Sequence, residues 1–580
     1  MEDREAFTRG RGIGWVMVLV VVCVLAYFNS LLNGFIWDDE RHLVGNIHIT
    51  TLAMPSRFFT VTYWMQLHPL PGLYRPLWML SYAVDYRLWG LLPLGYHFTS
   101  MMAHALATAF AFGAFRAMGV SARLAALASL LFAVNPVHVE LVVWIKNRAA
   151  LLACMFYLLA CGMFGLWARR HTEGTTERTR HEGHEERPLG WLWYAAALAA
   201  FVCALLSQSV SVTLPLTLTA YLWVACPGEQ RWRRLRATLP FWALTFAYLA
   251  FRVVCTHGII PQRPPPQPAL ISRFLVPLRT VAEYFGLALF PVYPCADRPF
   301  SLTAPATLHA WLTALGIVAL LAVVLGMTFQ RSPRLRFWVL WPLITLLPVA
   351  NLGLITGRPI AEQRLYLPSA GYSVLLAALL LKMTERGRRL AFAVAVLVLM
   401  LLAAGLVDRS FAWRTSATFW ADTVAKSPRQ GRDHYYYGVN CLGRGRTKAA
   451  FHHFQTAVAV NPHLTDAYDE MAKLHAARKE WDEAEACARK ATTISPWWPE
   501  GHNTLGVVFG LQGRYAEAAA AFNEALRIQP AHADARRNLA LAYRKLGLAD
   551  QAARAARPVT MPFSTGRKAG SGPAVTWSPE

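Results

Sequence analysis

Residues 389–407 read RLAFAVAVLVLMLLAAGLV, an apolar run that carries no charge after its first residue. A helix needs about 20 apolar residues to cross the hydrocarbon core of a bilayer. After residue 409 the sequence is instead rich in Ala, Arg, Glu and His. The run is therefore the last of a series of membrane-spanning helices and borders a soluble helical region, so we predict an all-α chain in two parts.

Further apolar segments of spanning length lie on the N-terminal side of this run, and the first follows Arg4, Arg9 and Arg11 as an uncleaved anchor. The run from Phe274 to Tyr293 is expected to form a half-buried helix in the external layer. We predict about eleven spans in a polytopic membrane domain over residues 1–409, near residues 13–33, 96–115, 123–144, 149–168, 190–207, 209–226, 238–256, 309–329, 335–352, 366–382 and 389–407.

The net charge of +23 comes from basic clusters between the predicted spans. Under this span count, six clusters fall on one side, and Lys and Arg mark the cytoplasmic side of a membrane protein. This placement accounts for the charge without nucleic acid, which we do not expect as a partner. An odd number of spans puts the C-terminal region on the opposite, external side. The clusters lie at residues 4–11, 116–123, 169–187, 231–236, 331–336 and 382–389.

A repeat with a period of 34 residues follows the membrane domain. Pro462, Pro496 and Pro530 are each 34 apart, and small residues recur in register with them (Gly438, Ala472, Gly506; Ala450, Ala484, Ala518). Small residues where two helices touch and a proline that closes the second helix indicate tetratricopeptide (TPR) repeats. We predict a TPR α-solenoid over residues 410–560, with a groove for an acceptor protein or peptide, and a disordered tail over 561–580.

Two adjacent carboxylates follow the first predicted span, in the sequence GFIWDDERHLVGN at residues 34–46. Ionised groups at the end of an apolar helix need water, a partner or a metal, so Asp38 and Asp39 are candidates for chemistry. As an alternative, they are interfacial anchors. The same loop contains LYRPLWMLSYAVDYRLWG at residues 73–90, where Arg75 lies in a rigid, charged turn. Its aromatic residues predict an interfacial helix or an aromatic belt.

Ionisable residues also interrupt the apolar sequence at membrane depth. His138, Glu140, Lys146 and Arg148 occur in FAVNPVHVELVVWIKNRAALLA at residues 132–153. Such residues are expensive in a bilayer unless they face a polar cavity. His97 and His104 are seven apart and share one helical face. We expect no metal site, since cysteine ligands are absent and further ligands are uncertain.

External arginines occur in NLGLITGRPIAEQRLYLPSAGY at residues 351–372. Arg358, Glu362, Arg364 and Tyr366 cluster here at a membrane boundary, against the positive-inside trend. Guanidinium groups suit phosphate through bidentate hydrogen bonds, which favours an anionic ligand. The alternative is a Glu362–Arg364 ion pair that fixes the loop. Carboxylates beside such cations would serve transfer from a lipid-linked phosphate donor to a hydroxyl group.

Seven motifs in a fixed order resemble the transmembrane and tetratricopeptide-repeat (TMTC-like) family and its bacterial relatives: WDDERHLVGN, YRPLW, YHFTSMMAHAL, NPVHVELVVWIKNRAALLA, SVTLPL, IAEQRLYLPSAGY and WRTSATFWADTVAKSP. The resemblance covers nearly the whole chain. It implies a protein O-mannosyltransferase-like glycosyltransferase of the GT-C fold. Such an enzyme transfers a sugar, mannose or another hexose, with inversion from a polyprenyl-phosphate donor to protein hydroxyls on the external face. No cofactor is certain, and a divalent cation is left open.

The resemblance also implies roles for individual residues. Asp38 or Asp39 would be the general base toward the acceptor hydroxyl. The donor phosphate would be held by His138, Arg148, Arg358 and Arg364, with Arg75, His97, His104, Glu140, Glu362 and Tyr366 in support.

The chain departs from the family pattern at several positions. Ser207, Gln208 and Ser209 stand where the family commonly has Ser-Lys-Glu, Asn135 replaces a His, and Ala150 replaces an acidic residue. The rival function is therefore a non-catalytic, membrane-anchored TPR scaffold for protein assembly. The excess of Arg over Lys and the Ala-rich repeats suggest a bacterium, hence the inner membrane with periplasmic repeats; the alternative is the endoplasmic reticulum with the repeats in the lumen.

Overall fold

The computed structural model describes residues 2–50, 54–60, 74–173, 187–226, 230–255, 270–289, 294–298, 333–349, 360–383 and 387–557, with isolated residues such as Trp64 and Arg358 between them. The chain divides into two compact units, Met1–Thr415 and Ser416–Glu580. Every regular element in the described ranges is a helix, which confirms the all-α prediction.

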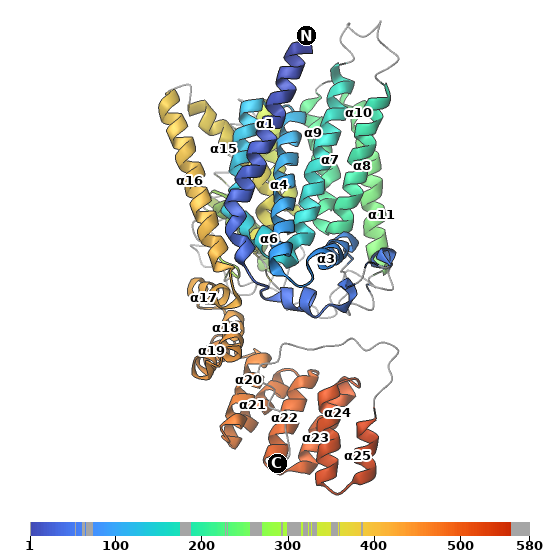
Figure 1. The fold of residues 1–580 in the computed structure, drawn as a ribbon, viewed down its shortest axis with the longest axis vertical. Coiled ribbons are helices and arrows are strands. Elements are labelled where there is room, and N and C mark those ends of the chain that lie inside the picture. Colours follow the sequence, from blue (N-terminus) through green and yellow to red (C-terminus); the bar gives the residue numbers. More distant parts are fainter. Residues whose placement is uncertain are drawn as a thin grey trace. The chain divides into compact units, whose positions relative to one another are not determined.

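The first unit is a bundle of long helices that stand side by side (Figure 1). Six helices in the described part are long and apolar enough to cross a membrane, and each matches a predicted span: Gly12–Leu32, Pro93–Ala117, Ile145–Arg170, Gly190–Ser207, Glu362–Met383 and Arg389–Ala412. They lie in α1 (Glu2–Tyr27), α4 (Pro93–Ala117), α7 (Arg148–Glu173), α8 (Arg187–Ser207), α15 (Tyr366–Met383) and α16 (Arg388–Ala412).

The predicted span over 123–144 is not one continuous helix, because the segment is broken. Helix α5 (Ala122–Ala133) is followed by η5 (Pro136–His138) and α6 (Val139–Val143), and the two parts meet at 53°. Pro136 has no N–H for a continuing helix and clashes with the preceding turn. Instead, the Asn135 side chain accepts a hydrogen bond from the Val137 N–H at 3.2 Å and starts the second part.

The remaining predicted spans correspond to shorter or undescribed segments. The predicted span 309–329 lies almost entirely outside the described residues, and the predicted half-buried helix near 274–293 corresponds to α12 (Leu270–Leu289). The count of eleven spans therefore stays a prediction. The shorter helices are α9 (Leu214–Ala225) after η8 (Ser209–Thr213), α11 (Leu239–Cys255), and α14 (Pro333–Leu346) with η10 (Leu347–Val349).

The first and last long helices of this unit end together. After α1, the turn η1 (Phe28–Leu32) leads to Asn33, whose side chain donates to the Ser410 carbonyl at 3.5 Å, and the Gly34 N–H donates to the Arg414 carbonyl at 3.0 Å. Figure 1 shows α1 and α16 running in the same direction. The N-termini of both helices and the short basic helix α10 (Gln230–Leu235) share the opposite end of the bundle.

The end where α1 and α16 finish is covered by short elements. These include α3 (Pro76–Trp89) and α6, which lie at this end in Figure 1. A buried cluster that contains Phe58, Trp64, Trp78 and Tyr82 packs the loop after α1 against α3. The other short elements of the unit are η2 (Glu40–Val44), η3 (Ile47–Ile49), η4 (Pro55–Phe59), η6 (Ile145–Asn147), η9 (Arg236–Thr238) and η11 (Glu362–Leu365).

Over the described residues 416–557, the second unit consists of α17 (Ser416–Lys426) and four helix pairs. The pairs are α18 (Gly431–Gly443) with α19 (Thr447–Val460), α20 (Thr465–Ala477) with α21 (Trp481–Ile494), α22 (Pro499–Leu511) with α23 (Tyr515–Ile528), and α24 (Ala533–Lys545) with α25 (Ala549–Ala556). The first residues of the corresponding helices repeat every 34 residues. The predicted tail at 561–580 lies outside the described residues.

Small residues in these repeats make room for a phenylalanine. A Cβ added to Gly438 would lie 2.6 Å from the Phe454 ring, and one added to Gly506 would lie 2.6 Å from the Phe522 ring. Ala450, Ala484 and Ala518 are fully buried. The period-34 pattern therefore reports close contact between the two helices of each repeat, as predicted.

Candidate functional site

Asp39 holds the loop after α1 against the segment before α7. Its carboxylate accepts the Ile36 N–H at 3.2 Å and the Lys146 N–H at 2.8 Å, and the residue is fully buried. Burial raises the pKa of the Asp39 carboxyl to about 7, although its two backbone hydrogen bonds act in the opposite direction. Asp39 is thus placed to organise the loop rather than to meet a substrate.

Asp38, by contrast, reaches solvent. Its carboxylate forms an ion pair with the Lys146 ammonium, and the two side chains are 31% and 29% exposed. Both partners therefore remain accessible to a ligand at the end of the bundle. The adjacent carboxylates therefore differ in their surroundings: Asp39 faces the protein interior and Asp38 faces solvent.

Two stacked tryptophans lie beside this ion pair, and Trp144 is buried. The Trp37 and Trp144 rings stack with centroids 4.6 Å apart and an angle of 4° between their planes. Lys146 Nζ lies 4.8 Å from the Trp144 ring centre, and the Arg358 guanidinium carbon lies 5.4 Å from that of Trp37. Trp37, Asp38, Trp144, Lys146 and Arg358 are called the tryptophan cluster below.

Trp37 has a left-handed backbone, with φ of 51°. This conformation is strained for a bulky residue and persists only where the surroundings hold it. The left-handed backbone of Trp37 is stabilised by stacking of its ring on Trp144 and by the two hydrogen bonds of the neighbouring Asp39. The turn presents Asp38 outward and Asp39 inward.

Arg358 is anchored by a buried carboxylate. One guanidinium nitrogen lies 2.8 Å from Glu140, and another donates to the Ala296 carbonyl. The Arg358 side chain is 12% exposed and that of Glu140 is fully buried. Arg364 donates to the Arg358 carbonyl at 2.8 Å and to the Tyr284 hydroxyl of α12 at 3.3 Å. The two predicted external arginines are therefore neighbours.

The Glu362–Arg364 ion pair considered from the sequence is wrong. Glu362 is fully buried, accepts the Cys295 N–H, and lies 3.5 Å from the guanidinium of Arg409 near the end of α16. Glu362 pairs with Arg409 instead, because η11 turns Glu362 inward, while Arg364 faces α12.

Arg148 lies deep in the bundle rather than in the tryptophan cluster. It forms a buried ion pair with Asp85 of α3, and donates to the Ser100 hydroxyl at 3.3 Å and the Tyr96 carbonyl at 2.7 Å. The side chains of the ion pair are 0% and 2% exposed. In this arrangement Arg148 joins α3, α4 and α7, and its donors already have acceptors.

His104 and His138 support the broken helix. His104 Nε2 lies 3.1 Å from the Ala133 carbonyl at the end of α5, and Nδ1 lies 2.8 Å from the Tyr366 hydroxyl. Because a carbonyl only accepts, Nε2 carries the hydrogen and Tyr366 donates to Nδ1. His138 Nε2 lies 2.7 Å from Ser369 Oγ, which itself donates to the Tyr366 carbonyl. Both histidines are fully buried.

Two further predicted supporting residues lie apart from the tryptophan cluster. His97 is buried on α4, seven residues or about two turns before His104. Arg75 caps the start of α3, with its guanidinium carbon 5.9 Å from the Trp78 ring centre. Among the described residues, no group of three or more His, Cys, Asp or Glu is arranged to hold a metal ion.

Sequence reasoning assigned no role to Lys146, Asp85, Trp37 and Trp144. Lys146 had a visible signal, as a lone ammonium in apolar sequence. Asp85 had the same signal, as one carboxylate within the aromatic segment 73–90. The stacking of Trp37 on Trp144 has no sequence signal, because it joins residues from separate segments.

The tryptophan cluster combines the groups that a group-transfer reaction at the membrane surface requires. It has a partly exposed carboxylate, a partly exposed ammonium, a guanidinium paired with buried Glu140, and two stacked tryptophan rings. A carboxylate can accept a proton from a hydroxyl group. Fixed cations stabilise a negative charge that develops on a leaving group.

Several curated relatives carry the name protein O-mannosyl-transferase. A family model described as a TPR repeat matches residues 511–547. A protein O-mannosyl-transferase of Caenorhabditis elegans is 24% identical over 79% of this chain and 65% of its own. The protein O-mannosyl-transferases TMTC1 and TMTC3 of Homo sapiens are 26% and 22% identical over 80% and 89% of this chain, and 58% and 60% of their own.

The chain spans about three fifths of the length of these curated relatives. Among solved structures, a crystal structure of MamA protein is 18% identical over 24% of this chain and 76% of its own, with a TM-score of 0.23. The resemblance drawn from the sequence motifs is confirmed by the relatives: they are protein O-mannosyl-transferases of the TMTC family, and the second unit of this chain contains a TPR repeat.

Proposed function

We propose that this chain is a membrane glycosyltransferase of the GT-C type. It moves a hexose, mannose by analogy with its relatives' names, from a polyprenyl-phosphate donor to a hydroxyl group of a protein. The observation that carries the proposal is the accessible Asp38 carboxylate paired with Lys146 at the end of the bundle, with Arg358 against the ring of the adjacent Trp37.

Asp38 is the general base, and Asp39 positions it. The proposal favours Asp38 because its side chain is 31% exposed, whereas Asp39 is fully buried and accepts two backbone N–H groups. The acceptor oxygen forms a bond to the anomeric carbon of the sugar as the bond from that carbon to the phosphate oxygen breaks. The acceptor proton goes to Asp38, and polyprenyl phosphate leaves from the opposite face of the sugar, so the transfer inverts.

Arg358 and Lys146 hold the donor phosphate, and Arg364 positions Arg358. Arg358 is fixed by Glu140, so its charge needs no reorganisation when the leaving phosphate gains charge. Lys146 sits on a flexible stem and is partly exposed. When it turns from Asp38 to the phosphate, it frees the carboxylate for the acceptor. His138 and Arg148 support the bundle behind this site and are not assigned to the phosphate.

The reaction takes place on the external face, with the TPR repeats on the same side to present the acceptor. Arginine-bearing ends of α4, α7, α10 and α16 share the end of the bundle opposite the short elements, which supports a cytoplasmic assignment for that end. The composition supports the bacterial inner membrane. In this proposal the chain has two domains, a transferase domain over residues 1–409 and a TPR domain over residues 410–560.

The test is transfer of mannose from synthetic polyprenyl-phosphate mannose to a Ser/Thr peptide by the full chain in detergent. We expect Asp38→Asn to lower kcat by about 10²- to 10⁴-fold, the usual contribution of general base catalysis. Asp408→Asn is the matched control, because Asp408 is an exposed carboxylate on α16. Full activity of Asp38→Asn, with an unchanged elution volume on size exclusion, would rule out Asp38 as the base.

The non-catalytic scaffold gives a different result in the same assay. The wild-type chain would transfer no sugar, and deletion of residues 430–560 would abolish its cellular function. An enzyme without its repeats would still transfer sugar to small acceptors.

A further inference from the structure

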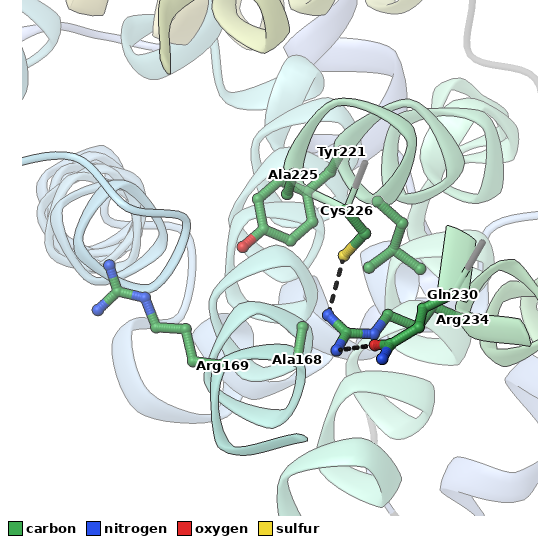
Figure 2. Close-up of a pocket in the computed structure, with 8 residues that line it drawn as sticks. Ala168, Arg169, Tyr221, Ala225, Cys226, Gln230 and Arg234 are labelled. Carbon is green, nitrogen blue, oxygen red and sulfur yellow. Dashed lines mark hydrogen bonds between the residues drawn. The ribbon is translucent and has the colours of Figure 1, made fainter. Parts of the chain in front are cut away.

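A second polar site lies at the end of the bundle opposite the tryptophan cluster. Figure 2 shows a pocket between the C-terminal ends of α7 and α9 and the short helix α10. Its volume is about 290 Å³, near the lower end of small-molecule sites. Ala168 and Arg169 line it from α7, Tyr221 and Cys226 from the end of α9, and Gln230 and Arg234 from α10.

Among the described residues, the hydrogen-bond partners of Arg234 in this pocket are neutral. Its guanidinium donates to Cys226 Sγ at 3.2 Å and to Gln230 Oε1 at 3.0 Å, and both acceptors are neutral (Figure 2). Within the described ranges, no carboxylate lies at ion-pair distance from Arg234. Arg169 stands on the other rim, with its side chain directed away from Arg234. A pocket with this lining attracts an anion.

The surroundings of the pocket place it at the depth of lipid headgroups. Trp223 and Trp232 are 46% and 68% exposed, and their rings meet edge to face with centroids 5.8 Å apart. Trp191 at the start of α8 is 63% exposed. Exposed tryptophans collect where hydrocarbon gives way to headgroups. The sequence of α10, QRWRRL, adds three arginines to the same level.

We infer that this pocket binds the phosphate of an anionic phospholipid headgroup. Arg234 holds the phosphate through charge-assisted hydrogen bonds, and the Tyr221 hydroxyl lies across the same pocket (Figure 2). Leu222 and Ala225 give the apolar wall along which the lipid enters between α7 and α9. Basic pockets between spanning helices bind lipid headgroups in this way. The site is independent of the transferase reaction.

The experiment measures lipid binding to the purified full chain in detergent by native mass spectrometry. Phosphatidylglycerol is titrated, with phosphatidylcholine as the zwitterionic lipid. We expect Arg234→Gln to weaken phosphatidylglycerol binding about tenfold, the effect of losing a hydrogen bond to a charged group. Arg233→Gln is the matched control, because it removes the same charge from an exposed position on the same helix, and should change binding less than about twofold.

Arg234→Lys keeps the charge without the planar fork and should bind with intermediate affinity. Equal losses for Arg233→Gln and Arg234→Gln would overturn the site in favour of general attraction to a basic surface. Displacement of the lipid by millimolar inorganic phosphate would overturn the headgroup assignment in favour of free phosphate. Unchanged thermal unfolding of Arg234→Gln is required, and Tyr221→Phe, which removes only a hydroxyl, gives a second variant if that condition fails.

Discussion

Lys479 occupies a turn position where the other three repeats have glycine, and replacing it should stabilise the chain. The backbone is left-handed at Gly445, Lys479, Gly513 and Gly547, with φ of 73°, 61°, 81° and 76°, and the four positions are 34 residues apart. Each joins the first helix of a repeat to the second. The turn therefore requires positive φ whatever residue stands there.

The expected gain follows from two opposing terms. A side chain in the left-handed region costs about 1–2 kcal/mol, and glycine loses about 0.5–1 kcal/mol more conformational freedom on folding than another residue. The Lys479 side chain is exposed, so its removal sacrifices no packing. The difference is a net stabilisation of about 0.7 kcal/mol for Lys479→Gly, or roughly threefold in a local opening equilibrium.

Native-state hydrogen exchange of the full chain in detergent can measure this change, because it reports the opening of individual helix pairs. Amides of α20 and α21 should exchange about threefold more slowly in Lys479→Gly. Gly513→Lys makes the reverse change in the next repeat and should speed exchange in α22 and α23 by a similar factor. If Lys479→Gly leaves exchange unchanged or speeds it, the assignment of strain to this turn is refuted.

Three other predictions concern single side chains. Arg148→Met should destabilise the chain by about 3–5 kcal/mol, because it strands the buried Asp85 charge, and adding Asp85→Asn should recover most of the loss in thermal unfolding; a fully stable single variant would contradict the buried pair. Gly506→Ala should cost about 1–3 kcal/mol and speed exchange in α22 and α23, because its Cβ meets the Phe522 ring, whereas unchanged exchange would mean that the ring moves aside freely. Burial raises the pKa of Asp39 to about 7 in the folded chain, above about 3.9 when unfolded. The folded state therefore binds the extra proton, and stability falls as pH rises from about 4 to 7. Asp39→Asn should flatten that part of the Tm profile, and an unaltered profile would argue against the raised pKa of Asp39.

The repeat unit could be predicted almost completely from the sequence. Each repeat packs locally, so the spacing of Gly438, Ala450 and Pro462 already encodes which helices touch. The bundle was less predictable, because hydropathy identifies an apolar segment but not a break in it. Pro136 lies within the predicted span 123–144 and begins η5, where the chain bends after α5.

The candidate site was predictable in its residue types but not in its pairings. An ionised group at the end of an apolar helix indicates Asp38, and an arginine against the positive-inside trend indicates Arg358. Lys146 lies 108 residues from Asp38, and Arg148 lies 63 residues from Asp85. No local pattern says which of two nearby cations reaches which carboxylate, because the choice depends on how the loop after α1 packs against α3 and α7.

The joined ends of α1 and α16 also impose an order on biosynthesis. Asn29 and Asn33 bond to carbonyls that lie 378 and 377 residues later in the chain. At about 5–20 residues per second, a ribosome needs roughly 20–80 s to produce those partners after the first helix has emerged. During this interval the segment that carries Asp38 lacks its anchor on α16. The end of the membrane unit that carries Asp38 is thus completed only when α16 has been inserted, and a chain that stops before α16 lacks these bonds.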